Sequence, residues 1–350
     1  MMKAEVLSHT LDFKQPAGTS RGVLRSKQCF FLKITDASTP FPVGWGEVGV
    51  LRGLSMDDVP ELEGQLCWTA EHIHWGLDRL YAANAQFPSV QFALEQAFSH
   101  LHNGFQHFDT PYSLGQGSLP INGLIWMGDE AFMLDQISKR LAEGFTTLKM
   151  KVGAIDWATE RELLEGIRKS FSPDELILRV DANGAFNVEQ ALEVDKVLSD
   201  LAVHSIEQPI PVNDREGLAV LAAKTKVPIA LDESLIGLVD RESRSKLLDD
   251  IKPPFIILKP SFIGGWKGAD QWIALAEERG IGWWATSALE SNIGLNAIAQ
   301  WASTKGNSLP QGLGTGSLYT NNIPGPHLVS GGEISIPGDV QQDWDLSVLL

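Results

Sequence analysis

The chain has 350 residues, of which 43% are hydrophobic and 21% are charged, a composition typical of a folded protein rather than a disordered one. Its 44 acidic residues outnumber its 28 basic ones, giving a formal net charge of −16, and no segment is a basic cluster, so we expect no nucleic-acid partner. At roughly 150 residues per domain, this length predicts about two domains, or one large barrel with an appended unit.

No hydrophobic run reaches the roughly 18 residues that a membrane span requires, so we expect no membrane partner. Residues 1–18 lack the uninterrupted apolar stretch of a secretory signal. Only two cysteines occur, Cys29 and Cys67, without a CxxC motif, and both are expected to be reduced thiols. These features predict a cytoplasmic protein, and they do not indicate its oligomeric state.

The first 110 residues are predicted to form an α+β unit, strands first and helices after. The segments AEVLSHTLDF (4–13) and VLRSKQCFFLKITD (23–36) are rich in β-branched and aromatic residues, with the turn-rich KQPAGTSRG (14–22) between them. Hydrophobic residues then follow a helical period from about 57 to 108, and the last helix is expected to end at Gly104.

From about residue 120, short apolar runs alternate with amphipathic helical segments. The runs recur about every 25–30 residues, the length of one βα unit, and predict a (β/α) barrel over residues 111–316. They are PINGLIWMG, TTLKMKVG, LILRVDANG, VHSIEQP, VPIALDES, FIILKPSFIGG, IGWWATSALES and LPQGLGTG. Residues 317–350, which include the strand-like GGEISIPG, are expected to pack back on the N-terminal unit.

Charged residues stand at the ends of these apolar runs. They are Lys149 and Lys151, then Asp181, Glu207, Asp232 and Lys259, with successive strands contributing one group every 25 to 30 residues. The carboxyl ends of parallel barrel strands open on one mouth, so we expect these side chains to converge there. A single charge at a strand end is usually a solvated loop residue, but six in register indicate an active site. Three carboxylates without His or Cys suit Mg²⁺ better than Zn²⁺.

These motifs resemble those of the enolase superfamily, in its muconate-lactonizing-enzyme-like branch, over essentially the whole chain. The family's capping-domain loop is similar to GWGEVGVLRGLS, and its last two barrel strands are similar to ATSALESNIGL and LPQGLGTGSLYTNNI. Its catalytic strand ends are similar to LKMKVG, LRVDANGAF, SIEQPI, IALDESL and FIILKPSFIGG. The resemblance implies an α/β fold, a (β/α)7β modified TIM barrel (111–316) with an α+β capping domain (1–110). The S-x-x-E-S-x-x-G segment and GLGTG resemble the o-succinylbenzoate synthase family within this branch.

The resemblance implies a lyase that dehydrates 2-succinyl-6-hydroxy-2,4-cyclohexadiene-1-carboxylate to 2-succinylbenzoate in menaquinone biosynthesis. The substrate is a small anionic carboxylate, and its proton α to the carboxylate is removed to give an enediolate. Asp181, Glu207 and Asp232 are implied to bind Mg²⁺, for which Mn²⁺ is an expected substitute, and the metal stabilises the enediolate.

The three lysines are implied to be catalytic. Lys151 is the expected base, and the ammonium of Lys149 together with the metal is expected to lower its pKa. Lys259, from the opposite side of the mouth, acts either as a cation against the enediolate or as a second acid and base.

Several other residues are expected near the substrate. Asn183 shares a face with Asp181, and Glu233 either faces outward in an ion pair or supports the site from behind. Arg21 is either a lid residue that reaches a substrate carboxylate or a solvated turn residue. The loops 18–22 and 49–55 are expected to border the pocket. At the end of the seventh strand, Ser287, Glu290 and Ser291 are expected either to contact the substrate or to support the residues that do. Eighth-strand contacts are expected from Gly314 and Thr315.

Two other functions remain open. An N-acylamino acid racemase or a dipeptide epimerase of the same superfamily would use the same catalytic set, although GLGTGS offers no charged group to hold an amino-acid moiety. A non-catalytic barrel is disfavoured, because six charged groups are costly to bring together in an inactive site.

Overall fold

An antiparallel sheet and a group of helices form the N-terminal part of the chain in the computed structural model, which describes residues 2–19, 22–153 and 155–350. The sheet has the order β1 (Lys3–Thr19), β2 (Gly22–Thr35), β3 (Val43–Val48), and the helical elements are α1 (Leu62–Glu71), η1 (Ile73–Trp75), α2 (Leu77–Ala83) and α3 (Pro88–Asn103). Helix α3 lies so close to β3 that a Cβ atom at Gly46 would come within 1.9 Å of the Ala93 carbonyl oxygen. As predicted, α3 ends before Gly104, whose φ of 62° suits glycine.

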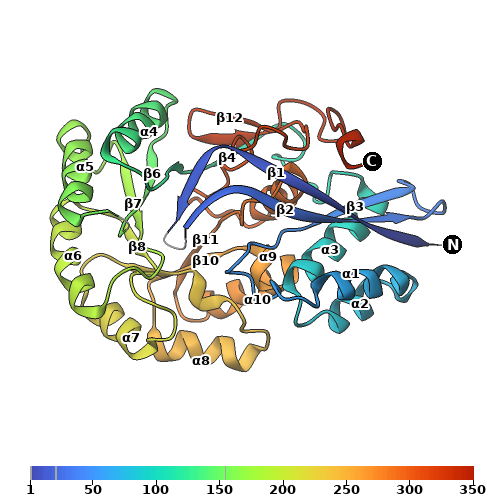
Figure 1. Ribbon diagram of the computed structural model, residues 1–350, viewed down its shortest axis with the longest axis horizontal. Coiled ribbons are helices and arrows are strands. Elements are labelled where there is room, and N and C mark those ends of the chain that lie inside the picture. The colour runs from blue at the N-terminus through green and yellow to red at the C-terminus, as the bar shows by residue number, and fades with distance from the viewer. Residues whose placement is uncertain (1, 20–21, 154) are drawn as a thin grey trace.

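The turn predicted over residues 14–22 is wrong for residues 14–19, because β1 continues through them. The pairing register between β1 and β2 shifts between Asp12 and Ala17, so a bulge absorbs the extra residues. Strand β1 is an edge strand, where the missing N–H of Pro16 is tolerated. The resulting long hairpin reaches from the cap toward the barrel (Figure 1).

Seven parallel strands form the barrel sheet, in chain order. They are β5 (Gly123–Ile125), β6 (Thr147–Lys151), β7 (Ile177–Asp181), β8 (Ser205–Glu207), β9 (Ile229–Leu231), β10 (Phe255–Leu258) and β11 (Gly282–Ala285). The eighth position is a short segment that pairs in parallel with both edges, through Ile121 with Gln311 and Thr286 with Gly312. This closes the sheet and confirms the predicted (β/α)7β barrel.

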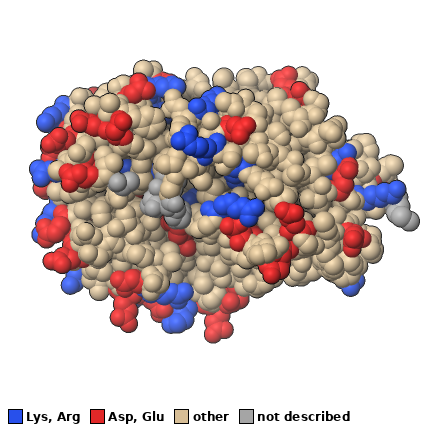
Figure 2. Space-filling view, in the orientation of Figure 1, with Lys and Arg blue, Asp and Glu red and all other residues tan. Residues whose placement is uncertain are grey.

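Helices cover the outside of this sheet (Figure 1). They are α4 (Glu130–Ala142), α5 (Trp157–Ser170), α6 (Val188–Asp200), α7 (Arg215–Lys224), α8 (Arg241–Ile251), α10 (Gly265–Glu277) and α11 (Asn292–Ser303). Two short helices stand at strand ends instead, η2 (Glu233–Leu235) after β9 and α9 (Pro260–Ile263) after β10, and Phe262 of α9 lines the cavity described below. Across the described parts of the chain, no helix is long and apolar enough to cross a membrane. On the face in Figure 2, acidic and basic side chains are interspersed over the barrel helices.

The C-terminal tail divides between two neighbours. Its hairpin β12 (Leu328–Ser330) and β13 (Glu333–Ser335) pairs with β4 (Ser118–Pro120), directly before the first barrel strand, and not with the cap. Other parts of the tail do contact the cap: the Lys14 amide donates to the Leu318 carbonyl at 2.8 Å, and the ring of Trp344 stacks on Phe105. The last described helix is η3 (Ser347–Leu349). The domain boundaries at 110 and 316 stay predictions.

Candidate active site

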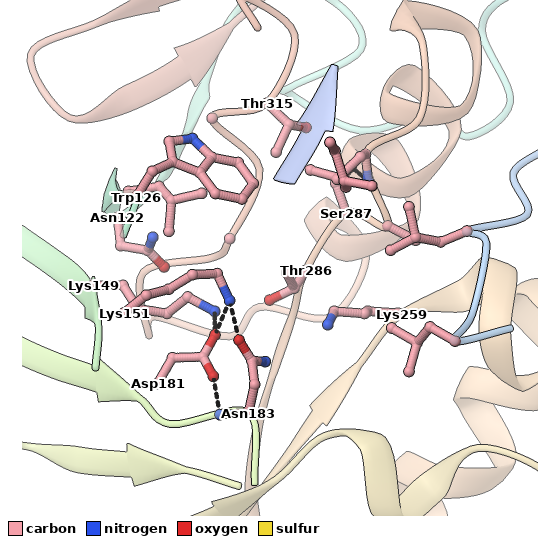
Figure 3. A pocket seen from close by; sticks show the side chains of 18 of the residues that line it. Asn122, Trp126, Lys149, Lys151, Asp181, Asn183, Lys259, Thr286, Ser287 and Thr315 are labelled. Carbon is pink, nitrogen blue, oxygen red and sulfur yellow. Dashed lines mark hydrogen bonds and ion pairs between the residues drawn. The ribbon is translucent and has the colours of Figure 1, made fainter. Parts of the chain in front are cut away.

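A cavity lies where the barrel strands end and the cap loops cover them. The barrel contributes most of its polar lining, from Lys149, Lys151, Asp181, Asn183, Lys259, Asn122, Thr286, Ser287, Gly312, Gly314 and Thr315. The cap contributes Leu24, Leu51 and Leu54, which confirms that the 49–55 loop borders the pocket. Figure 3 shows Lys151 and Lys259 entering the pocket from opposite sides.

Lys149 links the carboxylates of two neighbouring strands. Its Nζ lies 3.0 Å from Oδ2 of Asp181 and 2.7 Å from Oε2 of Glu207, and all three side chains are buried. Burial alone would lower the pKa of Lys149, but the charges of Asp181 and Glu207 outweigh burial and raise it, so Lys149 stays an ammonium. Burial also acts to raise the pKa of Asp181, but Lys149 and Lys151 lower it, so this carboxylate stays ionised.

Lys151, at the end of β6, is held by a chain of hydrogen bonds. Its Nζ lies 2.8 Å from Oδ2 of Asp181 and 2.5 Å from Oδ1 of Asn183 (Figure 3). The Asn183 amide nitrogen donates in turn to Oε1 of Glu233 at 2.9 Å. Glu233 is therefore buried and turned toward the site, and its supporting role stays a prediction.

Lys259 and Asp232 form a second ion pair, across the mouth from Lys151. Burial would lower the pKa of Lys259, but Asp232 and Glu207 outweigh it and raise this pKa. Gln208 fixes the backbone around Asp232, since its Oε1 accepts from the Asp232 amide at 3.3 Å and from the Ser234 amide at 3.2 Å.

The strand-end carboxylates have the chemistry of a divalent-cation site, although the described residues include no three His, Cys, Asp or Glu side chains already arranged around one point. Asp181 and Glu207 are paired in register on adjacent strands, and both reach one cationic atom of Lys149. Oε1 of Glu207 is buried and accepts no hydrogen bond. All the available donors are hard oxygens, so these residues fit Mg²⁺.

The seventh-strand residues divide into two groups. Ser287 lines the cavity, whereas Glu290 and Ser291 do not. Glu290 instead accepts from Ser261 and Ser287, each at 2.5 Å, and Ser291 caps α11 and donates from Oγ to Glu47 of β3 at 2.6 Å. Of the two alternatives predicted for Glu290 and Ser291, these contacts favour support of the site over direct substrate contact.

The predicted eighth-strand contacts, Gly314 and Thr315, do line the cavity, and Oγ1 of Thr315 is buried without a hydrogen-bond partner. Oδ1 of Asn122, another lining residue, is likewise buried and unpaired. Arg21, predicted as a lid or turn residue, lies outside the described residues.

Sequence reasoning missed Arg179, which lies two residues before Asp181 and faces the barrel interior. Its Nη1 donates to the Pro310 carbonyl at 2.7 Å, and its guanidinium lies 4.1 Å from the ring centre of Trp284. Its parity with Asp181 could have indicated this position. Gln208 and Asn122 were also missed, because a neutral amide beside a strand end carries no pattern of its own.

The arrangement suits proton transfer next to a carboxylate. Two lysines face one cavity from opposite sides (Figure 3), and each is paired with a carboxylate, Lys151 with Asp181 and Lys259 with Asp232. A carbon acid bound between them could lose a proton to one lysine while positive charge stabilises the resulting anion.

Comparisons with known proteins agree with this geometry. The enolase C-terminal domain-like family model matches residues 133–340. The chain is 45% identical to an o-succinylbenzoate synthase of Desulfotalea psychrophila strain LSv54, over 93% of this chain and 96% of that protein. The crystal structure of MenC from Desulfotalea psychrophila LSv54 has a TM-score of 0.84 and 41% identity, covering 96% of this chain and 99% of that one. An L-Ala-D/L-Glu epimerase of Bacillus subtilis strain 168 is 28% identical, over 97% of this chain and 94% of that protein.

Proposed function

The chain belongs to the enolase superfamily and, within it, to the o-succinylbenzoate synthases, and from this premise we propose that it dehydrates 2-succinyl-6-hydroxy-2,4-cyclohexadiene-1-carboxylate to 2-succinylbenzoate in menaquinone biosynthesis. It is an enzyme, a lyase of that family. The observation that carries the proposal is the pair of lysines, Lys151 and Lys259, which face one cavity from opposite sides, each paired with a buried carboxylate. We place the enzyme in the cytoplasm.

Members of this superfamily bind a divalent metal ion, and we assign the ion here to Mg²⁺, with Mn²⁺ as a substitute. Asp181, Glu207 and Asp232 would hold it, and the bound ion would supply positive charge to the substrate carboxylate and to the enediolate. The unpaired Oε1 of Glu207 and the all-oxygen donor set support this assignment.

Lys151 is the proposed base. Its neutral amine takes the proton α to the substrate carboxylate, and the electron pair of that C–H bond enters the enediolate. The C–O bond to the ring hydroxyl then breaks, and Lys151 returns its proton to the departing oxygen, so that water leaves and the aromatic ring forms. Lys149 stays an ammonium and adds positive charge on the same side of the site.

Lys259 is the proposed electrostatic partner. Asp232 holds its ammonium on the opposite side of the cavity, where it lies against the negative charge that develops on the substrate. Because elimination can begin and end on one face, Lys259 need not transfer a proton in this reaction.

The opposed lysines also suit a racemase or epimerase, which must move protons on both faces of a carbon. The eighth-strand segment opposes that alternative, since its lining residues Gly312, Gly314 and Thr315 offer no charge to an amino-acid moiety. The purified protein with Mg²⁺ should convert the cyclohexadiene precursor to 2-succinylbenzoate, followed by absorbance. Rapid racemization of N-succinylamino acids with no detectable 2-succinylbenzoate would reject this function in favour of the alternative.

A further inference from the structure

Leu289 occupies a strained backbone conformation on the wall of the cavity. Its φ is 63°, in the left-handed region that a leucine adopts only when its surroundings impose it. The side chain lines the cavity and packs in one apolar cluster with Ala17 of the cap and Trp126 of the barrel. The conformation of one residue therefore helps to shape the pocket wall.

Two buried donors from distant parts of the chain hold the carbonyl oxygen of Leu289. Nζ of Lys27, on β2 of the cap, lies 2.8 Å away, and the hydroxyl of Tyr319, in the tail after the barrel, lies 2.7 Å away. The Leu289 amide donates to Oγ of Ser287, a cavity residue, at 3.0 Å.

The cap also holds the chain just beyond Leu289. Glu47, on β3, accepts from the Ser291 amide at 2.9 Å and from the Gly294 amide at 3.0 Å, in the first turn of α11. Nζ of Lys27 lies 4.0 Å from Oε1 of Glu47. The carboxylate that binds the start of α11 therefore also offsets the positive charge of the lysine that binds Leu289. These groups are buried, and they make no contact with the cavity.

We propose that Tyr319 and Lys27 are positioning residues for substrate binding. They hold Leu289 in the left-handed conformation and so keep Leu289 and Ser287 on the cavity wall before the substrate arrives. Without these two hydrogen bonds, residues 287–289 would have to become ordered when the substrate binds. The free energy of ordering them would weaken substrate affinity and would not slow the chemical step. The proposed function enters this proposal only through the choice of substrate for the kinetic test.

Tyr319→Phe is the first test, because it removes one hydroxyl and keeps the ring that packs 4.7 Å from Phe13. Hydrogen exchange of a peptide covering residues 286–292, measured without substrate, should become faster. The KM for the cyclohexadiene precursor should rise about fivefold while kcat stays within about twofold, as expected for one lost hydrogen bond that acts on binding. Unchanged exchange in this peptide would overturn the proposal, even if the protein proved to have another activity.

Two variants of Leu289 test whether Tyr319 affects KM through the backbone conformation of residue 289. Leu289→Ala and Leu289→Gly both remove the side chain, but only glycine adopts the left-handed conformation freely. Tyr319→Phe should raise KM about fivefold in the alanine background and less than about twofold in the glycine background. Equal effects in both backgrounds would overturn the proposal.

The role of Lys27 is tested in a variant that also removes the negative charge of Glu47. Lys27→Met combined with Glu47→Gln removes the ammonium without leaving the Glu47 carboxylate charged, and the same peptide should exchange faster than in Glu47→Gln alone. Equal exchange in these two variants would exclude Lys27 from the role.

Discussion

Oδ1 of Asn183 lies 2.5 Å from Nζ of Lys151, and the other end of the same amide binds Glu233. Since an amide oxygen carries no net charge, it can orient Lys151 without adding to the negative charge of Asp181 beside it. Asn183→Ala should therefore lower kcat by at least about tenfold, the effect expected for one hydrogen bond to a charged or reacting group, with little change in KM. Glu233→Gln keeps an acceptor for the Asn183 amide and is the matched control, with an expected loss of less than about threefold.

Steady-state kinetics of the two variants on the cyclohexadiene precursor measure this difference. A normal kcat for Asn183→Ala would show that Lys151 needs no such orientation.

The lysines should respond differently to substitution. Lys151→Ala removes the only proposed base and should abolish dehydration to background, whereas Lys259→Arg keeps the positive charge and should retain measurable activity. Racemization needs both lysines, so either change should abolish it, and each single variant would exchange the α-proton of one enantiomer at most.

Deuterium incorporation into each enantiomer of an N-succinylamino acid, measured by NMR beside 2-succinylbenzoate formation, separates the two reactions. Unimpaired dehydration by Lys151→Ala would disprove the mechanism even though the family assignment stands.

The metal ligands can be tested without turnover. Glu207→Gln should weaken Mn²⁺ binding by at least about tenfold, measured from the EPR signal of the free ion, because a neutral amide is a poorer ligand than a carboxylate. Glu193→Gln changes an exposed carboxylate on α6 and should leave Mn²⁺ affinity unchanged.

Equal Mn²⁺ affinity in both variants and the wild type would remove Glu207 from the proposed ligands. Activity that persists after exhaustive chelation would argue against a required metal altogether.

Buried histidines should make the protein less stable in acid. Burial, together with the nearby charge of His100, lowers the pKa of His107 to about 3, whereas in the unfolded chain it is about 6.5. Between these values the unfolded chain takes up a proton that the folded protein does not, so the free energy of unfolding falls as pH falls below about 6.5. This one histidine should cost about 2 kcal/mol between pH 7 and pH 5.

His107→Gln should therefore lose about 2 kcal/mol less than the wild type over the same change, measured by urea unfolding at the two pH values. The difference between the two proteins isolates His107 from Asp57 and Glu95, whose pKa values burial raises to about 6 and about 8 and which act in the opposite direction. Parallel losses in the two proteins would contradict a neutral buried His107.

The strand-end charges could be predicted from the sequence because their pattern is local. A strand has a period of two, a βα unit has a narrow length range, and both are visible along the chain, so Lys151 and Asp181 could be placed at one mouth. The partners of these groups could not be predicted in the same way. Whether Lys149 binds one carboxylate or bridges two depends on how far a flexible side chain reaches between strands.

Two differences between expectation and structure have tertiary causes. KQPAG has the composition of a turn, yet it is strand because β2 offers a partner and an edge position tolerates Pro16. Ser291 stands at a strand end beside cavity residues, yet its side chain binds the cap, because Glu47 from residues 43–48 reaches across to α11. Contacts between segments more than 200 residues apart leave no periodic trace in either segment.

The cavity draws its reacting groups from the barrel and part of its apolar wall, Leu24, Leu51 and Leu54, from the cap. The residues that shape this wall are therefore separate in sequence from the residues that transfer protons. A substitution at Leu51 would change the shape of the cavity while leaving every proposed proton-transfer group in place.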